Sequence, residues 1–176
     1  GAGGTNRKTA ASRLKTYVGG GVTTASVWGQ TTATSTGGYL TSNWEEADHD
    51  GSSVLGSSMT ESSGVFTFPS TGHWFCTFKL ACNEASGEEN AYVNNRMDIT
   101  LDDSSYSAFS GGTQFFASSD QDSIKYSSAY CSGILDVTNV SNVKIKFMFQ
   151  IQGTIEMIGN TVDYPTQVSF IKLADT

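Results

Sequence analysis

The sequence predicts an all-β protein, a two-sheet antiparallel jelly-roll sandwich with an extended N-terminal arm. Three observations predict it. The composition combines 19 glycines and 11% aromatic residues with only 2 prolines, which favours pleated strands joined by short turns. Several segments alternate apolar and polar residues, as strands with one buried face do. Turn signals separate about eight to ten such segments, a pattern typical of a sandwich or jelly roll.

A chain of 176 residues suits one domain. We predict an arm over residues 1–21 and a head over residues 22–176. The arm is basic and Gly-rich, and a short helix over Thr9–Tyr17 suits its composition. Two interpretations stay open: a solvated tail, common at termini, or an arm that docks on an acidic or extended neighbouring surface. The docking residues would be Arg7, Lys8, Arg13, Lys15 and Tyr17.

The first part of the head predicts three short strands and an acidic loop. The strands are expected at Val22–Trp28, Tyr39–Trp44 and Val54–Thr60. Residues Glu45–Gly51 concentrate carboxylates around His49, and hard cations prefer carboxylate oxygens. The spacing matches no calcium loop, so we interpret the segment as a solvated acidic loop and predict no metal site, with a cation site as the alternative.

Residues 64–80 carry the clearest local pattern and predict two strands joined by a tight turn. Pro69 and Gly72 mark the connection, since proline cannot donate to a strand ladder and glycine relieves a tight turn. Phe75 lies on the nominally wet face of the second strand, where an aromatic side chain indicates a second buried surface such as a subunit contact. The opposite, core-facing set is Trp74, Cys76, Phe78 and Leu80.

The second half of the head predicts further strands with polar connections. Asn83–Asn95 is predicted to be an exposed loop, and Gly153–Pro165 a connection. Turn chemistry explains Asp120 and Asp122, although a carboxylate pair such as Asp102 with Asp120 stays open. The strands are expected at 96–101, 113–117, 126–137, 143–151 and 168–173. In the fourth of these, Val143, Ile145, Phe147, Phe149 and Ile151 share one face, opposite Lys144, Lys146, Met148 and Gln150.

Several functional classes are disfavoured by what the sequence contains. A formal charge of -7 disfavours nucleic-acid binding, which needs clustered basic residues. No apolar run approaches the roughly 20 residues of a membrane-spanning helix, so we expect no membrane partner. The histidines, His49 and His73, stand beside no nucleophile motif, and no Gly-x-Ser-x-Gly elbow occurs. We therefore predict no enzyme, no catalytic residue and no cofactor.

The cysteines do not form a disulfide framework. Their odd number, three, leaves at least one free thiol. Cys76 and Cys82 are roughly 20 Å apart along an extended strand, which is too far for a bridge between them. Whether Cys131 pairs with one of them stays open.

Three parts of the chain resemble the tumour necrosis factor-like superfamily, specifically the globular-head branch named after a complement component. They are residues 64–78, the strand around Phe147 and the ending Val168–Leu173. In that branch a Gly or Asn leads into Phe-x-x-Pro, followed by Gly-x-Tyr-x-Phe-x-Phe. Here Trp74 replaces the usual Tyr and Cys76 the usual first Phe. The resemblance covers residues 22–173.

Other parts depart from the branch: the final strand lacks its usual Gly, and Ser141–Asn142 stands where many members have Gly-Asp. The resemblance implies a homotrimeric jelly roll, a fold used in animals for ligands and in phages for virion components. Ser/Thr/Gly-rich turns and the ending Phe170–Asp175 are similar to head domains of marine tailed-bacteriophage structural proteins. No collagen-like repeat or heptad stalk precedes the head, so we expect a virion protein rather than an animal secreted head.

The leading hypothesis is a non-enzymatic phage virion structural protein at the virion surface, made in the host cytoplasm. It would decorate or cement the capsid, or dock on the tail, and its arm would contact capsid or tail proteins. The alternative is the receptor-binding head of a tail fibre or spike, whose loops Thr31–Gly38, Asn83–Asn95 and Asp102–Gly112 recognise host glycan or protein. A coat protein with its arm on the genome is weaker, because four basic residues neutralise little nucleic acid.

Face assignment and resemblance together suggest the residues of the threefold contact. For each of them a place in the monomer's own core stays equally open. The three candidates are Phe75, Met148 and Phe170.

Overall fold

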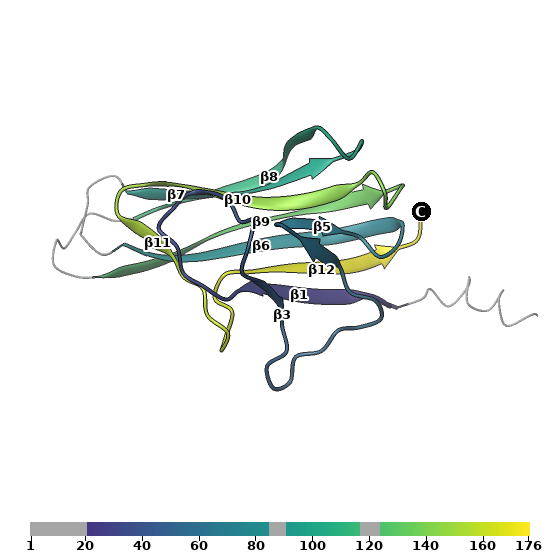
Figure 1. Cartoon of the computed structure of the whole chain (residues 1–176), viewed down its shortest axis with the longest axis horizontal. Helices are drawn as coiled ribbons and strands as arrows, with labels where there is room; N and C mark the ends of the chain where they lie inside the picture. The colour runs from purple at the N-terminus through teal and green to yellow at the C-terminus, as the bar shows by residue number, and fades with distance from the viewer. Residues whose placement is uncertain (1–20, 85–90, 117–123) are drawn as a thin grey trace, which may run out of the picture.

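Two antiparallel sheets pack face to face and enclose one apolar core (Figure 1). The computed structural model describes residues 21–84, 91–116 and 124–176. Nearly the whole predicted arm lies outside these residues, including Arg7, Lys8, Arg13, Lys15 and Tyr17. The arm's helix, its docking role and its boundary therefore stay predictions.

Sheet A has its strands in the order β3, β1, β12, β6 and β9, and β11 pairs with the far end of β6. Neighbouring strands are antiparallel throughout. The strands are β1 (Ala25–Gln30), β3 (Trp44–Glu46), β6 (Gly72–Glu84), β9 (Lys125–Val137), β11 (Ile155–Met157) and β12 (Gln167–Ala174).

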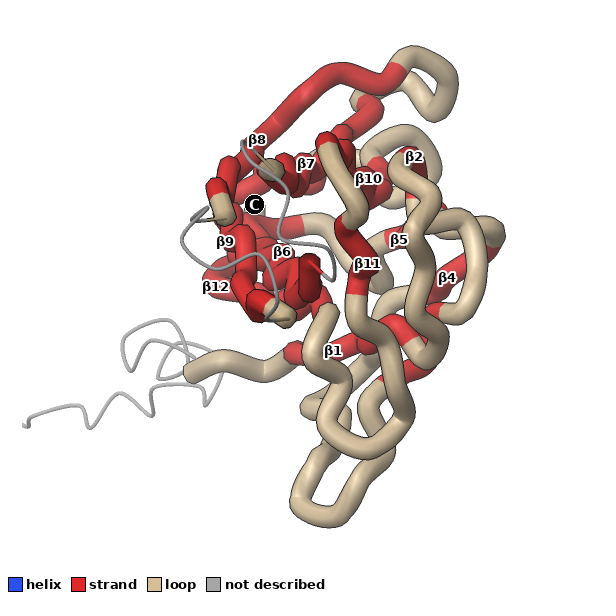
Figure 2. The backbone as a smooth tube through the Cα atoms, turned by 90° about the vertical axis from the view of Figure 1, so that its left-hand side faces the viewer, coloured by secondary structure: helices blue, strands red, loops and turns tan. Residues whose placement is uncertain are grey.

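Sheet B has the order β4, β5, β10, β7 and β8, and β2 pairs with β10. Figure 2 shows β7, β8 and β10 on one side of the molecule and β6, β9 and β12 on the other. The predicted two-sheet sandwich is confirmed. The strands are β2 (Gly38–Tyr39), β4 (Thr60–Ser62), β5 (Val65–Thr67), β7 (Tyr92–Thr100), β8 (Tyr106–Phe115) and β10 (Lys144–Gln152).

The predicted hairpin over residues 64–80 is wrong, because β5 lies in sheet B and β6 in sheet A. The chain crosses between the sheets here, and Phe68 and Trp74 meet in the core with their ring centroids 5.3 Å apart. Gly72 has φ +139°, and a Cβ there would lie 2.4 Å from the carbonyl oxygen of Ala174. Alternation shows that both strands have a buried face but does not show that these faces oppose each other.

Aromatic side chains from both sheets form the centre of the core. Phe147 of β10 contacts Phe66, Phe78 and Phe170, with ring centroids 5.5, 5.2 and 6.0 Å away. Each such pair contributes about 0.5–1.5 kcal/mol beyond the burial of its area. Phe170 is fully buried among these rings. Its assignment to a threefold contact is therefore corrected, since the chain's own sheets enclose it.

The other element predictions are confirmed in part. The strands predicted over 126–137, 143–151 and 168–173 correspond to β9, β10 and β12. The predicted loop Asn83–Asn95 is wrong at both ends, because β6 and β7 extend into it. The strand predicted at residues 113–117 is also wrong at its start, because β8 begins at Tyr106. These segments are rich in Asn, Ser and Gly, so their composition resembles that of turns. The connection 153–165 contains β11, while Val54–Thr60 contributes one bridge at Leu55 and the start of β4.

All three cysteines are free and buried. The predicted free thiol is confirmed, and neither pairing of Cys131 occurs. Burial raises the pKa of the Cys76 and Cys82 thiols to about 12 and that of Cys131 to about 11. Because the thiolate is the reactive form, these side chains act as small apolar core residues.

Tyr164 holds the acidic segment Glu45–Gly51 beside β1. Its ring lies over Gly29, where an added Cβ would come 2.0 Å from Cδ1 of Tyr164. Its hydroxyl lies 3.0 Å from a carboxylate oxygen of Glu45 and 3.2 Å from one of Asp48, and it donates to these acceptors. Tyr164 adopts φ +42°, so the surrounding contacts maintain an uncommon backbone conformation.

Changing Gly29→Ala should displace Tyr164 and lower the free energy of unfolding by about 1–3 kcal/mol, because overpacking forces buried groups to move. Thermal unfolding measures this loss. Gly21→Ala is the matched control, since a Cβ at Gly21 meets no atom within 4 Å. Equal melting temperatures for the two variants would contradict the described packing.

Candidate subunit interface and surface groove

An apolar row crosses the outer face of sheet A. Ala25 of β1 lies opposite Ile171 of β12, Ile171 opposite Phe75 of β6, and Phe75 opposite Ile134 of β9. Residues directly opposite in a sheet point to the same face, so these four side chains adjoin one another on one surface. Ile134 is 58% exposed, and Phe75 and Ile171 are half-buried. We call these four residues the apolar row.

Large side chains extend this surface along β9. Tyr130 and Tyr126 are 55% and 71% exposed and lie on the same face, opposite Lys79 and Asn83. The row next to the apolar row consists of small or uncharged residues, Val27, Ser169, Thr77 and Ser132. A contiguous exposed apolar patch marks an interaction surface.

The three predicted contact residues do not come together. Phe75 lies on the outer face of sheet A, as its alternation predicted, while Phe170 lies in the core. Met148 lies on the opposite side of the molecule, on the outer face of sheet B, where Tyr39 and Arg96 are its partners in register. Phe75 is therefore the member of this set that the structure places on the apolar surface.

A compact charged cluster covers part of the outer face of sheet B. Asp98, only 2% exposed, accepts hydrogen bonds from Arg96 Nε and Nη2 at 2.6 and 2.8 Å and from the Tyr39 hydroxyl at 2.5 Å. Lys146 Nζ lies 3.9 Å from the ring centroid of Tyr39 and 3.8 Å from that of Tyr106. Such cation–π contacts contribute about 0.5–2 kcal/mol. We call these five residues the cation cluster.

The charges of this cluster set the protonation state of its members. Burial by itself would raise the pKa of Asp98, but hydrogen bonds from Arg96 and Tyr39 and the charges of Arg96 and Lys146 outweigh it and lower the pKa below its ordinary value. The same hydrogen bond to Asp98 raises the pKa of Tyr39. At neutral pH Asp98 is therefore ionised and Tyr39 keeps the proton that it donates.

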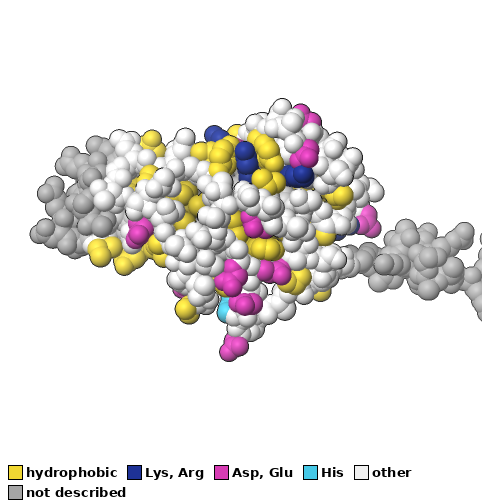
Figure 3. Space-filling model, viewed as in Figure 1, with side chains coloured by type: hydrophobic (Ala, Val, Ile, Leu, Met, Phe, Trp, Pro, Cys, Tyr) yellow, Lys and Arg dark blue, Asp and Glu magenta, His cyan; other side chains and the backbone are white. Residues whose placement is uncertain are grey.

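Figure 3 shows basic side chains beside hydrophobic ones near the top of the view, and acidic side chains gathered near the bottom. The acidic gathering fits the segment held by Tyr164. The outer face of sheet B carries three basic residues, Arg96, Lys144 and Lys146, on the neighbouring strands β7 and β10. Sequence analysis placed Lys144 and Lys146 on one face but missed Arg96 beside them, because Arg96 is far away along the chain.

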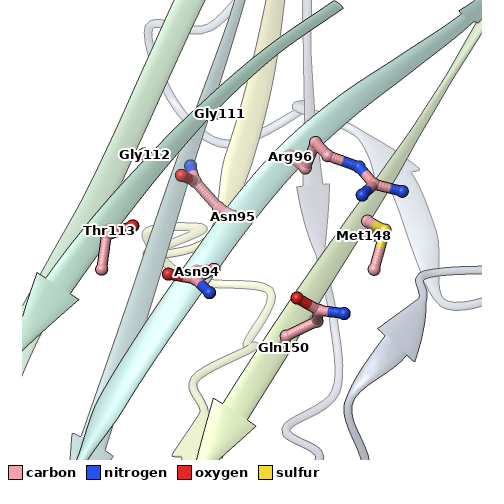
Figure 4. A pocket seen from close by; sticks show the side chains of 8 residues that line it. All are labelled: Asn94, Asn95, Arg96, Gly111, Gly112, Thr113, Met148 and Gln150. Carbon is pink, nitrogen blue, oxygen red and sulfur yellow. The ribbon is translucent and has the colours of Figure 1, made fainter. Parts of the chain in front are cut away.

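A small groove adjoins the cation cluster. It has a volume of about 220 Å³ and lies among β7, β8 and β10 (Figure 4). Its β8 side is low at Gly111, which carries no side chain. Asn94 lies between Thr113 of β8 and Gln150 of β10. The residues that line the groove are Asn94, Asn95, Arg96, Gly111, Gly112, Thr113, Met148 and Gln150.

Asp102, one member of the predicted carboxylate pair, is accounted for by the local turn. Asp102 accepts hydrogen bonds from the backbone of Ser104 and Ser105 and from the hydroxyl of Thr100, and these bonds lower its pKa. The turn predicted after Leu101 is confirmed. Asp120 lies outside the described residues, so its pairing with Asp102 stays untested.

Within residues 21–84, 91–116 and 124–176, no group of three or more His, Cys, Asp or Glu side chains could hold a metal ion. The same ranges contain no helix that is long and apolar enough to cross a membrane. His49 packs beside Tyr164, with ring centroids 5.6 Å apart, and His73 lies opposite Asp136 in sheet A.

Among the loops predicted to bind a receptor, Thr31–Gly38 connects β1 and β2, as predicted. Thr34 in this loop forms a β-bridge with Met157 of β11. Asp102–Gly112 is largely strand, since β8 takes Tyr106 onward. The outer face of sheet B, and not a set of loops, therefore presents the polar and aromatic side chains of this region.

Comparison with known proteins identifies the fold. No family model and no curated protein matches the chain. Murine APRIL, solved at pH 5.0, matches with a TM-score of 0.60 and 10% identity, over 85% of this chain and 98% of that chain. Eiger TNF from S. frugiperda matches with a TM-score of 0.58 and 14% identity, over 86% and 93%. The fold is a TNF-like jelly roll. At these identities the similarity concerns the fold alone.

Replacing Asp98→Asn should lower the free energy of unfolding at pH 7 by about 1–2 kcal/mol, since Arg96 and Tyr39 lose a charged acceptor that is only partly screened by solvent. The folded-state pKa of Asp98 is lowered, so its stabilising contribution is present above the unfolded pKa and is lost as pH falls through the folded pKa. Urea unfolding at pH 7 and at acidic pH measures both effects.

The matched control for this experiment is Asp136→Asn, which changes an exposed carboxylate of β9. The stability difference between Asp98→Asn and the parent protein should shrink on acidification, while the control should track the parent throughout. A constant difference at all pH values would show that Asp98 is not ionised in the folded protein.

Proposed function

We propose that this chain is the non-enzymatic head of a homotrimer that assembles through the outer face of sheet A. The observation that carries this proposal is the apolar row, in which Phe75 and Ile134 lie side by side on a solvent-facing sheet. The resemblance at residues 64–78 implies a threefold assembly, and the TNF-like fold agrees with it. A threefold axis near Phe75 would bring three copies of the row together.

The apolar row is too small to form a stable interface by itself, so the proposed subunit contact extends beyond it. Stable interfaces bury about 1,200–2,000 Å² in total, more than four side chains supply. Tyr130, Tyr126 and Leu173 continue the exposed surface on β9 and β12. Apolar burial contributes about 25 cal/mol per Å², and part of that gain offsets the entropy lost on association.

Phe75→Glu and Ile134→Glu should each convert the trimer to monomers, because a trimer would bury three unpaired carboxylates near its axis. Light scattering coupled to size exclusion measures the mass. Both side chains are at least partly exposed in the monomer, so the monomers should keep their strand content by circular dichroism.

Leu101→Glu is the matched control, since Leu101 is an exposed apolar residue just after β7 in sheet B. This variant should remain trimeric. A trimeric mass for both Phe75→Glu and Ile134→Glu, with unchanged melting, would remove the apolar row from the interface.

We propose further that the trimer is a structural component at the surface of a tailed-phage virion, made in the host cytoplasm, and that residues 1–21 dock it on capsid or tail proteins. The Ser/Thr/Gly-rich turns and the ending Phe170–Asp175, which resemble head domains of marine tailed-bacteriophage structural proteins, support the assignment to a virion. The arm contains four of the ten basic residues and none of the seventeen acidic ones, so it suits an acidic neighbouring surface. Repetition over many copies would strengthen weak individual contacts.

Deleting residues 1–21 should abolish incorporation into particles and leave the trimer folded. The test compares purified particles by mass spectrometry and the isolated protein by light scattering. A full-length control in which Arg7, Lys8, Arg13 and Lys15 are changed to Ser separates charge from length. Normal incorporation of the truncated protein would disprove docking through the arm.

A second candidate function is the receptor-binding head of a tail fibre or spike that recognises host glycan or protein. The groove beside the cation cluster favours it, because this polar surface lies on sheet B and stays accessible when sheet A forms the subunit contact. Purified protein that binds host cells and blocks infection would favour this function over capsid decoration.

A further inference from the structure

A buried carboxylate fixes the direction of the Arg96 side chain on the outer face of sheet B. Asp98 is 2% exposed and accepts hydrogen bonds from Nε and Nη2 of Arg96. These two nitrogens share one edge of the planar guanidinium group, so Nη1 lies on the opposite edge. Nη1 has no hydrogen-bond acceptor among the described residues, and the Arg96 side chain is 40% exposed. The guanidinium group is therefore held in place with donors left for a ligand.

The groove lies on the side of Arg96 that faces away from Asp98. Asp98 follows Arg96 by two residues on β7, whereas Asn94 precedes it by two and lines the groove with Gln150 beside it. Gly111 is opposite Arg96 in register and has no side chain, so the β8 flank of Arg96 is open. In Figure 4 the Arg96 side chain extends from β7 toward β10. A ligand in the groove can therefore reach Nη1.

The charge of this surface favours an anion. Lys146 is diagonal to Arg96 in the pairing of β7 with β10, and such neighbours are roughly 7–8 Å apart. This is within the screening length of about 10 Å at 0.1 M salt. Lys146 forms no ion pair within the part of the chain that the structure describes. The cation cluster thus carries two positive charges against the single negative charge of Asp98.

This grouping stands out on an acidic head. Residues 22–176 contain six basic and seventeen acidic residues, yet three of the six basic residues lie together on the outer face of sheet B. An oxyanion with two terminal oxygens matches the planar fork of a guanidinium group. Arg96 is therefore suited to a carboxylate or a sulfate group.

The other groups of the groove suit a polyhydroxylated ring. Thr113 and Gln150 are exposed and line the groove, and each offers a donor and an acceptor. Met148 adds an apolar surface. The volume of about 220 Å³ is below the roughly 300 Å³ at which pockets for drug-sized ligands begin. One sugar ring fits that size.

Aromatic side chains continue this surface beyond the groove. Tyr92 and Phe115 lie opposite each other in β7 and β8, with ring centroids 5.9 Å apart, and Phe115 is 66% exposed. Tyr92 precedes Arg96 by four residues, roughly 13 Å along the strand. This length accommodates more than one ring of an oligosaccharide, and burial of the apolar ring faces against the aromatic side chains is favourable.

A peptide suits this surface less well. The strand β7 is paired with β8 on one side and with β10 on the other. Its backbone hydrogen-bonding groups are therefore used within the sheet, whereas a peptide that binds by strand addition needs a free edge. A saccharide binds through its hydroxyl and acidic groups and needs no such edge.

We propose that this groove binds an acidic saccharide, whose carboxylate or sulfate group accepts hydrogen bonds from Arg96 and whose hydroxyl groups contact Gln150 and Thr113. Lys146 adds to the attraction through its charge. The inference rests on receptor recognition, the second candidate function, and is independent of the trimer.

The test applies labelled full-length protein to an array of neutral, carboxylated and sulfated oligosaccharides and measures each acidic hit by titration calorimetry. Acidic members should bind at least about tenfold more tightly than their neutral counterparts, the difference expected for one charge-assisted hydrogen bond. A preference for carboxylated or for sulfated members identifies the oxyanion, and either one supports the proposal.

Two variants test the residues of the groove. Arg96→Lys keeps the charge but loses the planar fork, and Gln150→Glu places a like charge beside the bound anion. Each should weaken binding at least about tenfold. Gln150 is exposed, so Gln150→Glu should keep the melting temperature of the parent even if Arg96→Lys, which touches the buried Asp98, is destabilised.

Asn142→Asp is the matched control, because it makes the same change of charge at an exposed residue in the turn before β10. Asn142 precedes Gln150 by eight residues, roughly 26 Å along an extended strand. This variant should bind acidic glycans as the parent does.

Three results would overturn the proposal. The first is an absence of binding to every acidic glycan. The second is acidic binding that neither Arg96→Lys nor Gln150→Glu weakens, which would place the site elsewhere. The third is equal affinity for acidic glycans and their neutral counterparts, which would show that Arg96 does not bind an oxyanion.

The same samples separate this inference from the functions proposed above. A trimeric mass without glycan binding would leave assembly through sheet A intact and reject the saccharide. Binding to host cells without any glycan hit would support receptor recognition but reject the saccharide class.

Discussion

The packing of aromatic rings between the two sheets is the constraint on which the rest of the structure depends. Phe147 touches rings from β5, β6 and β12, and therefore joins sheet B to sheet A at the centre of the sandwich. The crossing of the chain between β5 and β6 makes this possible, since it brings Phe68 and Trp74 into the core from opposite sides. Once these rings are buried, the period-two geometry of each strand determines which side chains face outward.

The two outer faces that result have different chemistry. On sheet A the register aligns Ala25, Ile171, Phe75 and Ile134 into one apolar row. On sheet B the register instead aligns tyrosines, Asn94 and paired charges beside a small groove. Sheet A therefore presents an apolar outer face, and sheet B presents a polar and charged one.

Strand prediction succeeded most clearly where a β-branched or aromatic residue occupied every second position, as in β10. It failed where polar residues line a strand. Asn94 and Asn95 resemble a loop by composition, yet Asn95 is buried because its amide bridges to Phe78 and Ala129 of the opposite sheet. Such a hydrogen bond joins residues far apart in sequence, so no local pattern signals it.

Composition and alternation alone determined the all-β class, the inward face of β10 and the outward direction of Phe75, because these properties depend on backbone geometry within a single strand. The tertiary structure decided which strands share a sheet, that Phe170 is enclosed, and that Tyr39, Asp98 and Lys146 form one cluster. Pairing and register between distant strands settle those questions, and both depend on how two apolar faces fit together in space.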